Sequence, residues 1–547
     1  MVITDFLERN ARLYGSETAL VEINPSDERD NAVTWRDFNL IESAHPGIPY
    51  RREMSWRDFD RRANRFANLL LSRGIQRGAK VGILLMNCLE WLPVYFGVLK
   101  AGCIAVPMNF RYSSDEIKYC LDLADVEVLV FGPEFITRMD PIVSDLAKVK
   151  TLFFVGHTPP PAYAEDGMKL TTFCSSSAPP VQLTETDYAA IYFSSGTTGF
   201  PKAILHDHRA LVCACEVEQN HHGQTRDDVF LCIPPLYHTG AKMHWFGSLL
   251  SGSKAVLLRG VKPEWILRAV TEEKCTIVWL LVPWAQDLLD AIESGRVDLN
   301  HYYLDQWRLM HIGAQPVPPS LINRWLKIFP HHKYDTNYGL SESIGPGCVH
   351  LGVENIDHVG AIGKAGYLWE TEIRDDRGEA ITAPEQVGEL AVRGPGVMKC
   401  YYKNPEATAE ILRDGWLLTG DMAKYDEDGF IYLVDRKKDV IITGGENLYP
   451  VQIEDFLRAH PKIKDVAVIG LPDDRLGEIA AAIVEIKEGE SCTEAEIDEF
   501  CTGLPRYKRP KKIILASVPR NPTGKIEKPK LREIYCGKRL VEAQTTR

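Results

Sequence analysis

Apolar and polar positions in the first third of the chain follow an alternating pattern of strands and helices. Short apolar runs at residues 81–85, 103–106 and 126–131 predict strands, and the segments between them, 91–100 and 115–123, have helical spacing. Strands separated by helical segments of about ten residues are typical of β-α-β units. We therefore predict a mainly parallel sheet.

The pattern changes twice along the rest of the chain. A second α/β stretch covers residues 228–338, and short β-like runs with intervening glycines follow at 355–435. Residues 439–547 have the pattern of a compact α+β unit. We predict an α/β fold with a large N-terminal domain, residues 1–437, of mainly parallel α/β subdomains and a small β-barrel-like layer. A small mobile α+β domain, residues 438–547, follows the charged run Asp435-Arg436-Lys437-Lys438-Asp439.

Composition limits the class of protein. The 547 residues are too many for one core, because single cores rarely exceed roughly 250–300 residues. A formal net charge of −12 argues against a broad basic surface for nucleic acid. Thirteen cysteines without a C-x-x-C pair, and no apolar signal or membrane-spanning run, favour reduced thiols. We therefore expect a cytoplasmic protein with no transmembrane segment and no nucleic-acid partner.

A glycine- and hydroxyl-rich loop follows the predicted strand at residues 189–193. It reads Ser194-Ser195-Gly196-Thr197-Thr198-Gly199-Phe200-Pro201-Lys202 and leads toward a predicted helix near His208. Glycine allows the backbone to approach phosphates, hydroxyls and N–H groups donate hydrogen bonds, and lysine adds a compact positive charge. The loop therefore suits a polyphosphate. It does not match the P-loop pattern, since Lys202 follows proline and no hydroxyl residue follows Lys202.

The ordered sequence S-S-G-T-T-G-F-P-K resembles the phosphate-binding loop of the adenylate-forming superfamily, which contains acyl-CoA synthetases, luciferases and the adenylation domains of peptide synthetases. The resemblance implies that the loop binds ATP and AMP and that Thr198 helps to hold Mg²⁺. The loop residues concerned are Ser194, Ser195, Gly196, Thr197, Thr198, Gly199 and Lys202. Further motifs match in the family's order up to residue 525.

Two motifs near the middle of the chain resemble the family's adenine-binding segments. Asn337-Tyr338-Gly339-Leu340-Ser341-Glu342 is similar to Y-G-x-T-E, with Ser341 in place of the usual threonine. The resemblance implies that Tyr338 lies against adenine and that Glu342 binds Mg²⁺, a cation that favours carboxylates together with substrate phosphates. His311-Ile312-Gly313-Ala314-Gln315-Pro316 resembles the G-A-x-P segment, which implies that Gly313, Ala314 and Gln315 line the adenine.

Four motifs in the C-terminal part complete the resemblance. Trp416-Leu417-Leu418-Thr419-Gly420-Asp421 and Asp435-Arg436 imply that Asp421 and Arg436 bind the ribose, and Lys438 occupies the hinge position between the domains. The loop Gly444-Gly445-Glu446 matches the loop that lines the pantetheine tunnel of coenzyme A. Pro522-Thr523-Gly524-Lys525 matches the motif of the catalytic lysine, whose charge stabilises the adenylation transition state.

The predicted acyl pocket is small, uncharged and partly aromatic. His238 resembles the family's aromatic gate beside the acyl carbonyl, and the predicted pocket residues are Thr239, Gly240, Trp284 and Ile312. Trp245 is a further candidate for an aromatic wall. No aspartate at residues 238–241 is present to pair with an α-amino group, which disfavours an amino acid. An apolar acid (fatty, aryl or alicyclic) fits, since burial gains about 0.8 kcal/mol per CH₂.

The resemblance implies two half-reactions. The acid and ATP give an acyl-adenylate and pyrophosphate, and coenzyme A then gives acyl-CoA and AMP after the small domain rotates about Lys438. The cofactors and partners implied are ATP, Mg²⁺, coenzyme A and a small carboxylic acid, and a homodimer is left open. An enzyme that loads a carrier protein, a luciferase-like oxidase and a non-catalytic nucleotide or fatty-acid sensor are the alternatives.

Overall fold

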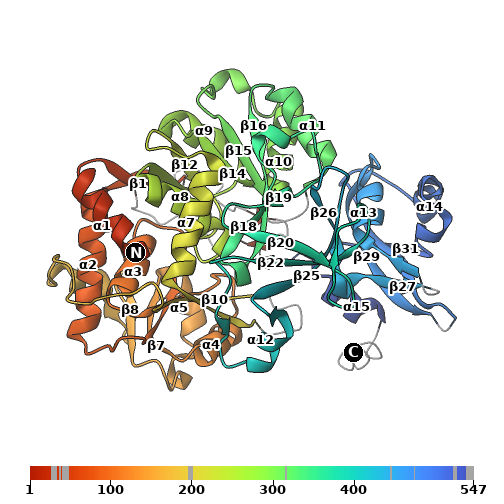
Figure 1. Ribbon diagram of the computed structural model, residues 1–547. Helices are drawn as coiled ribbons and strands as arrows, with labels where there is room; N and C mark the ends of the chain where they lie inside the picture. The colour runs from red at the N-terminus through yellow and green to blue at the C-terminus, as the bar shows by residue number, and fades with distance from the viewer. Residues whose placement is uncertain are drawn as a thin grey trace. The chain divides into compact units, whose positions relative to one another are not determined.

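The computed structural model describes residues 1–25, 34–35, 38–39, 49–194, 201–313, 317–443, 446–473, 475–520 and 526–536 (Figure 1). Side chains at 34–35, 38–39, 241, 346 and 446 are also left out of the description. The chain divides into two compact units. The first contains residues 1–371 and 392–417, and the second contains 372–391 and 418–547.

An eight-stranded sheet in the first unit has the order β23-β11-β10-β6-β5-β7-β8-β9. The strands β10, β6, β5, β7, β8 and β9, in this spatial order, all pair in parallel. The pairs β10 with β11 and β11 with β23 are antiparallel. The mainly parallel sheet predicted from the sequence is therefore confirmed. The strands are β5 (Lys80–Leu84), β6 (Ile104–Pro107), β7 (Val126–Phe131), β8 (Thr151–Phe154), β9 (Glu165–Asp166), β10 (Tyr188–Phe193), β11 (Ala203–Asp207) and β23 (Cys400–Tyr401).

A seven-stranded sheet of the same unit has the order β16-β15-β14-β12-β13-β1-β4, and only the pair β1 and β4 is antiparallel. Its strands are β1 (Thr18–Ile23), β4 (Arg51–Ser55), β12 (Val229–Cys232), β13 (Lys254–Leu258), β14 (Ile277–Leu281), β15 (Leu309–Gly313) and β16 (Lys333–Asp335). A smaller antiparallel sheet contains β17 (Asn337–Leu340), β18 (Gly345–His350) and β19 (Lys364–Ala365). A separate pair joins β2 (Thr34–Trp35) and β3 (Phe38–Asn39).

The helices of the first unit cover these sheets. They are α1 (Ile3–Leu13), α2 (Trp56–Ser72), α3 (Trp91–Lys100), α4 (Ser114–Leu123), α5 (Ile136–Met139), α6 (Gly167–Thr172), α7 (His208–His222), α8 (Thr239–Ser251), α9 (Pro263–Glu273), α10 (Val282–Glu293), α11 (Pro319–Ile328) and α12 (Pro405–Ile411). Helix α7 packs on β10 and β11 of the first sheet, whereas α8 packs on β12 and β13 of the second. Because α7 and α8 also pack on each other, this helix pair joins the two sheets (Figure 1).

The predicted amphipathic helix α2 shows how the core is built. The hydroxyl of Ser55 accepts a hydrogen bond from the N–H of Asp58 and caps the helix, as its sequence position predicts. Phe59 on the buried side packs edge-on against Phe96 of α3, and it also contacts Trp245 of α8. Trp245 is completely buried, and its ring packs in this aromatic core.

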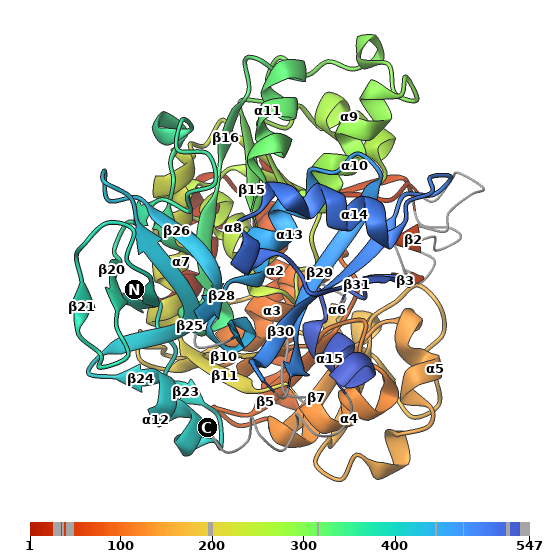
Figure 2. The same cartoon turned by 90° about the vertical axis from the view of Figure 1, so that its right-hand side faces the viewer.

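The second unit contains a sheet with helices on both faces, as Figure 2 shows. Its strands are β27 (Ile441–Thr443), β28 (Glu446–Leu448), β29 (Ile463–Asp473), β30 (Gly477–Ile486) and β31 (Lys512–Leu515). Alternate residues of β29 contribute to two separate hydrophobic clusters. Val466 and Val468 face α13 (Pro450–Arg458) and α14 (Glu494–Phe500), whereas Ala467 and Ile469 face α15 (Lys528–Cys536).

The β-rich layer predicted at residues 355–435 is present as a six-stranded sheet. It contains β20 (Glu370–Arg374), β21 (Ala380–Ile381), β22 (Gly388–Arg393), β24 (Leu412–Arg413), β25 (Trp416–Tyr425) and β26 (Ile431–Arg436). The compact second unit takes in residues 372–391 and 418–437, which precede the boundary that the sequence analysis placed at Lys438. That domain boundary stays a prediction.

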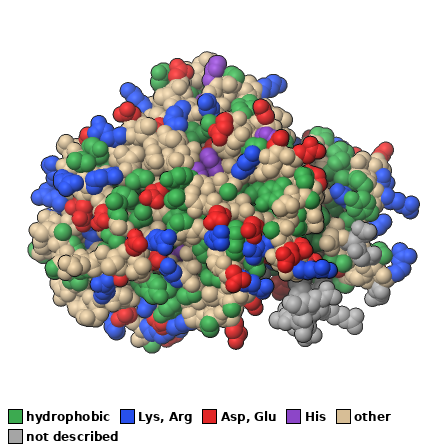
Figure 3. All heavy atoms as spheres, in the orientation of Figure 1, with side chains coloured by type: hydrophobic (Ala, Val, Ile, Leu, Met, Phe, Trp, Pro, Cys, Tyr) green, Lys and Arg blue, Asp and Glu red, His purple; other side chains and the backbone are tan. Residues whose placement is uncertain are grey.

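Two further findings concern the surface. No helix in the described part of the chain is long and apolar enough to cross a membrane. Acidic and basic side chains are interspersed over the face drawn in Figure 3.

Candidate active site

The ends of the glycine-rich loop are joined by two hydrogen bonds. The N–H of Ser194 donates to the carbonyl oxygen of Lys202 at 3.0 Å, and the N–H of Lys202 donates to Oγ of Ser194 at 3.1 Å. Strand β11 follows the loop, so the loop connects two antiparallel strands and the helix predicted near His208 begins after β11. The strand was missed because its five residues are too few to show a period. The predicted residues Ser195, Gly196, Thr197, Thr198 and Gly199 lie outside the described part of the chain.

The loop lysine and the predicted Mg²⁺ ligand both contact one tyrosine, Tyr401. The Nζ of Lys202 lies 4.7 Å from the centroid of the Tyr401 ring. The hydroxyl of Tyr401 donates a hydrogen bond to Oε1 of Glu342 at 2.7 Å. Burial and the neighbouring Glu342 carboxylate raise the pKa of Tyr401, so its phenol stays protonated and donates. The structure thus brings together two residues that are 140 positions apart in the sequence.

Tyr401 is a site residue that the sequence analysis did not find. Its position follows from strand register, because β23 pairs with β11 and places Tyr401 opposite Ile204, two residues after Lys202. Glu342 lies in a short 3₁₀ turn, Ser341–Ser343, and its carbonyl oxygen accepts a hydrogen bond from the N–H of Met398 at 2.8 Å. The residues before Tyr401 therefore also fix the backbone of Glu342.

The predicted acyl pocket and the predicted adenine motif meet at Ser341. Oγ1 of Thr239 lies 3.1 Å from Oγ of Ser341, and Nε2 of His206 lies 2.8 Å from the carbonyl oxygen of Ser341. Burial lowers the pKa of His206 to about 4, so the ring is neutral and its Nε2–H donates to that carbonyl. Three elements, β11, α8 and the 3₁₀ turn, are thereby fixed at one point.

His238 is the N-cap of helix α8 and contacts Gly240, a residue of the predicted acyl pocket. Nδ1 of His238 accepts a hydrogen bond from the N–H of Gly240 at 3.1 Å, so the imidazole caps the helix. A Cβ atom at Gly240 would lie 3.1 Å from both the His238 ring and Trp279. Glycine at this position therefore lets the helix start pass close to both rings.

The other described pocket and nucleotide residues lie on neighbouring elements. Ile312 and Gly313 end β15, and Trp284 is nearly buried at the start of α10. Tyr338, Gly339 and Leu340 follow Asn337 along β17. The side-chain N–H of Asn337 donates to Oε1 of Glu218 at 3.4 Å. Ala314 and Gln315 lie outside the described residues.

The two predicted ribose ligands are direct cross-strand partners in the second unit. Asp421 on β25 is opposite Arg436 on β26, and Nε of Arg436 lies 2.5 Å from Oδ1 of Asp421. Oγ1 of Thr419 accepts from the N–H of Asp421 and donates to the carbonyl oxygen of Leu390. Asp421 is thus buried, and an ion pair with Arg436 and a hydrogen bond from its own N–H to Thr419 hold it in place.

The structure describes only some of the other predicted site residues of the second unit. Lys438 is exposed in the 3₁₀ turn Lys437–Asp439. Glu446 begins β28, but its side chain is not described. Gly444, Gly445 and Lys525 lie outside the described residues. The roles of these residues stay predictions.

The Glu342 site suits Mg²⁺. Only its Oε1 receives the hydrogen bond from Tyr401, so the half-buried carboxylate keeps oxygen lone pairs for a hard cation. The Lys202 cation over the ring of Tyr401 would provide a second positive charge for phosphate. The described donors therefore fit a magnesium-polyphosphate ligand.

Family models match most of the chain. The model described as "AMP-binding enzyme" matches residues 7–402, and the model described as "AMP-binding enzyme C-terminal domain" matches residues 452–525. The C-terminal match lies entirely within the second compact unit.

Curated relatives cover nearly the same length. The long-chain-fatty-acid–CoA ligase FadD13 of Mycobacterium tuberculosis is 31% identical over 88% of this chain and 93% of that protein. The 2-succinylbenzoate–CoA ligase of Bacillus cereus is 31% identical over 84% of this chain and 89% of that protein.

Solved structures resemble the fold over almost its whole length. The anthranilate CoA ligase AuaEII in complex with anthranoyl-AMP has a TM-score of 0.85 at 25% identity, over 100% of this chain and 98% of that chain. ATP-bound MatB from Rhodopseudomonas palustris has a TM-score of 0.84 at 25% identity, over 98% and 99% of the two chains.

Proposed function

Because the chain belongs to the family of AMP-binding enzymes and is an AMP-forming acid–thiol ligase, we propose that it joins an apolar carboxylic acid to coenzyme A. In the first step the carboxylate attacks the α-phosphate of ATP and pyrophosphate leaves. In the second step the coenzyme A thiolate attacks the acyl carbon of the acyl-adenylate and AMP leaves. The arrangement of Lys202, Tyr401 and Glu342 is the observation that carries the proposal.

The first half-reaction uses positive charge at the loop. Lys202 would bind a terminal phosphate of ATP, while Tyr401 holds the Glu342 carboxylate by a 2.7 Å hydrogen bond. Glu342 and Thr198 would hold Mg²⁺, which when bound neutralises phosphate charge and aligns the leaving pyrophosphate. Lys525 would stabilise the charge that gathers between the attacking carboxylate and the α-phosphate.

The nucleoside would be held by residues from several motifs. We assign Asp421 to both ribose hydroxyls, because a carboxylate has two acceptor oxygens, and Arg436 to the same region. Adenine would lie against Tyr338, between the segments Gly313–Gln315 and Asn337–Ser341. These assignments rest on the motif matches.

The second half-reaction requires a path for a thin thiol arm. We assign this path to Gly444, Gly445 and Glu446, and the two glycines, which have no side chains, would let pantetheine pass along the backbone. A rotation about Lys438 would exchange Lys525 for this loop between the two steps, a hinge motion of a known kind.

The acid is proposed to be fatty, aryl or alicyclic. Thr239, Gly240, Trp284 and Ile312 offer small or apolar surface beside the His238 gate. The close approach of His238 and Trp279 at Gly240 supports a narrow pocket entrance with aromatic surface.

The test is pyrophosphate release with ATP and Mg²⁺ across acetate, C6 to C18 fatty acids, benzoates, cinnamates and alicyclic acids, with and without coenzyme A. Turnover that needs coenzyme A and forms AMP supports the ligase and names its acid. Adenylate formation without thioester formation on coenzyme A favours the second candidate, in which a carrier-protein phosphopantetheine is the acceptor. Failure to release pyrophosphate with every acid, although ATP binds, would contradict the proposal.

A further inference from the structure

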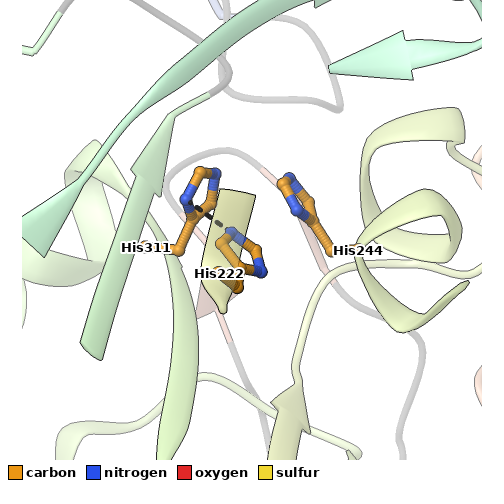
Figure 4. A group of neighbouring side chains, drawn as sticks. All are labelled: His222, His244 and His311. Atoms are coloured by element: carbon orange, nitrogen blue, oxygen red, sulfur yellow. Dashed lines mark hydrogen bonds between the residues drawn. The ribbon is translucent and has the colours of Figure 1, made fainter. Parts of the chain in front are cut away.

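Three buried histidines from three elements of the first unit lie close together. His222 ends α7, His244 lies on α8 and His311 lies on β15. One ring nitrogen from each can be chosen so that all three lie within 4.8 Å of one another, and the three side chains are almost completely buried. Figure 4 shows the three rings as neighbours, with a dashed line for the hydrogen bond between His222 and His311 and His244 beside them. None of the three has a role in the reaction described above.

A buried carboxylate completes a triangle with two of these rings. Nε2 of His222 lies 3.2 Å from Nδ1 of His311, and Oδ2 of Asp335 lies 3.8 Å and 3.7 Å from these two nitrogens. A point in the plane of the three atoms lies about 2.1 Å from each of them, which matches the 2.0–2.2 Å at which zinc binds histidine nitrogen and carboxylate oxygen.

A proton alone does not satisfy this triangle. One proton can bridge the 3.2 Å edge between His222 and His311, but distances of 3.7 Å and 3.8 Å are too long for a hydrogen bond to Asp335. The Asp335 carboxylate is fully buried, where a charge is costly unless it is paired, and its closest partner among the described residues, His350 at 2.9 Å, lies outside the triangle. A cation at the centre of the triangle would contact all three atoms at once.

Neighbouring residues also hold the third histidine, His244, and the Asp335 carboxylate in place. Nδ1 of His244 lies 2.5 Å from Oε2 of Glu218, and a carboxylate on one ring nitrogen commonly leaves the other nitrogen as metal ligand. Nε2 of His350 lies 2.9 Å from Oδ2 of Asp335, and the His350 ring stacks on His221 at 3.8 Å. These contacts hold both ligating groups in place.

We propose that His222, His244, His311 and Asp335 bind one divalent transition-metal ion, with zinc as the chemical type, and that Glu218 and His350 position these ligands. Three imidazoles and one carboxylate are the nitrogen and oxygen donors that zinc takes in four-coordinate sites. Since the ligands come from α7, α8, β15 and β16, the ion would join the helix pair to the seven-stranded sheet. The ion has a structural role, separate from Mg²⁺ at Glu342.

The full chain is produced in minimal medium supplied with Co²⁺ in place of Zn²⁺, because the ligands are buried and are expected to load during folding. Bound cobalt is counted per chain after dialysis, and the visible absorption is recorded. The expected result is one cobalt per chain with the intense visible bands of a four-coordinate site. The free cysteines are blocked with N-ethylmaleimide in a parallel sample, and binding is expected to persist because no cysteine belongs to the site.

Three variants locate the ion. H311Q and D335N are expected to lower bound cobalt to below about a tenth per chain. E218Q is expected to weaken affinity by 10–100-fold without abolishing binding, as loss of a ligand's hydrogen-bond partner does. H332Q is the matched control, since His332 is another largely enclosed histidine that packs on Phe329 outside the cluster. It is expected to keep one cobalt per chain.

Wild-type protein that carries less than about a tenth of an ion per chain, from both Co²⁺ and Zn²⁺ media, would overturn the proposal whatever the variants do. Full binding by H311Q and D335N, with the same absorption as wild type, would also overturn it. Loss of binding after cysteine blocking would assign the ion to thiolates instead. The metal count does not depend on the acid substrate, so failure of the proposed function leaves this test intact.

Discussion

The hydroxyl of Tyr401 donates a 2.7 Å hydrogen bond to the Glu342 carboxylate while the Lys202 ammonium lies over the same ring. A hydrogen bond to a charged group contributes roughly 1.5–3 kcal/mol. We therefore expect Tyr401→Phe to slow acyl-adenylate formation roughly 10–100-fold and to raise the Mg²⁺ concentration needed for half-maximal rate. Pyrophosphate release at varied Mg²⁺ measures both effects.

The neighbouring tyrosine provides the control. The hydroxyl of Tyr402, the next residue in the chain, donates a hydrogen bond to Asp125 at 3.0 Å instead of to Glu342. Tyr402→Phe should leave the adenylation rate and its Mg²⁺ dependence unchanged. Equal effects of the two substitutions would argue that Tyr401 acts only through packing.

Lys525 is predicted to act in only one half-reaction. Lys525→Ala should slow adenylation by on the order of 10²–10³-fold, the scale of losing one preorganised charge-stabilising group. Attack of coenzyme A on supplied acyl-adenylate should be largely spared. Separate assays of the two steps decide the point, and equal loss in both would contradict the proposed rotation about Lys438.

Asp421 is expected to affect ATP binding more than chemistry. Its carboxylate faces Arg436 on the adjacent strand. Both residues are distant in sequence from the loop lysine, Lys202. Because a ribose contact is made equally before and in the transition state, Asp421→Asn should raise the KM for ATP about 10-fold with a small change in kcat. Steady-state kinetics at saturating acid measure both constants.

Glu385→Gln serves as control for Asp421→Asn. Glu385 pairs with Lys424 on the same strand β25 but is largely exposed. Exposed ion pairs contribute little, so this variant should have wild-type kinetics. A kcat loss in Asp421→Asn larger than its KM change would assign Asp421 a role in the chemical step.

Sequence patterns predicted the strands and helices of residues 81–131 closely, because buried parallel strands and amphipathic helices have distinct periods. The helix at residues 91–100 and the strand at 126–131 have the predicted bounds. Motifs alone predicted Asp421 and Arg436 as ribose ligands, which stays a prediction, and the structure adds that the two residues are cross-strand partners.

Residues brought together only by tertiary structure left no sequence signal. Tyr401 reaches Glu342 through the register of β23 on β11, and no spacing predicts such a register. The histidine cluster likewise comes from elements spread over residues 218–350. His221-His222 was its one local sign, and two adjacent histidines at a helix end are common without a ligand.

Two buried lysines of the first unit differ in their partners, and this difference predicts opposite effects on stability. Lys242 is fully buried without a hydrogen-bond partner among the described residues, and its Nζ lies 4.1 Å from the centroid of the Tyr192 ring. Lys100 is also buried, but its Nζ contacts Glu8, Asp60 and Asn64 at 2.7–2.8 Å.

Replacing each lysine with methionine keeps a side chain of similar length and removes the amine. Lys242→Met should raise the free energy of unfolding by about 1 kcal/mol or more, because an unpartnered amine is no longer desolvated. Lys100→Met should lower it by about 1–3 kcal/mol, because its carboxylate partners lose their cation. Urea unfolding of the wild type and both variants gives these differences.

Burial lowers the pKa of Lys242 well below its usual value near 10.5. The unfolded chain therefore binds a proton at this lysine that the folded chain lacks, so stability rises with pH until the unfolded group also loses its proton. The contribution is about 1.4 kcal/mol per pH unit in that range. Wild type should thus gain stability relative to Lys242→Met as pH rises from 7 to 9. Parallel pH profiles of the two proteins would show that Lys242 is protonated in the folded state and that the ring of Tyr192 stabilises its charge.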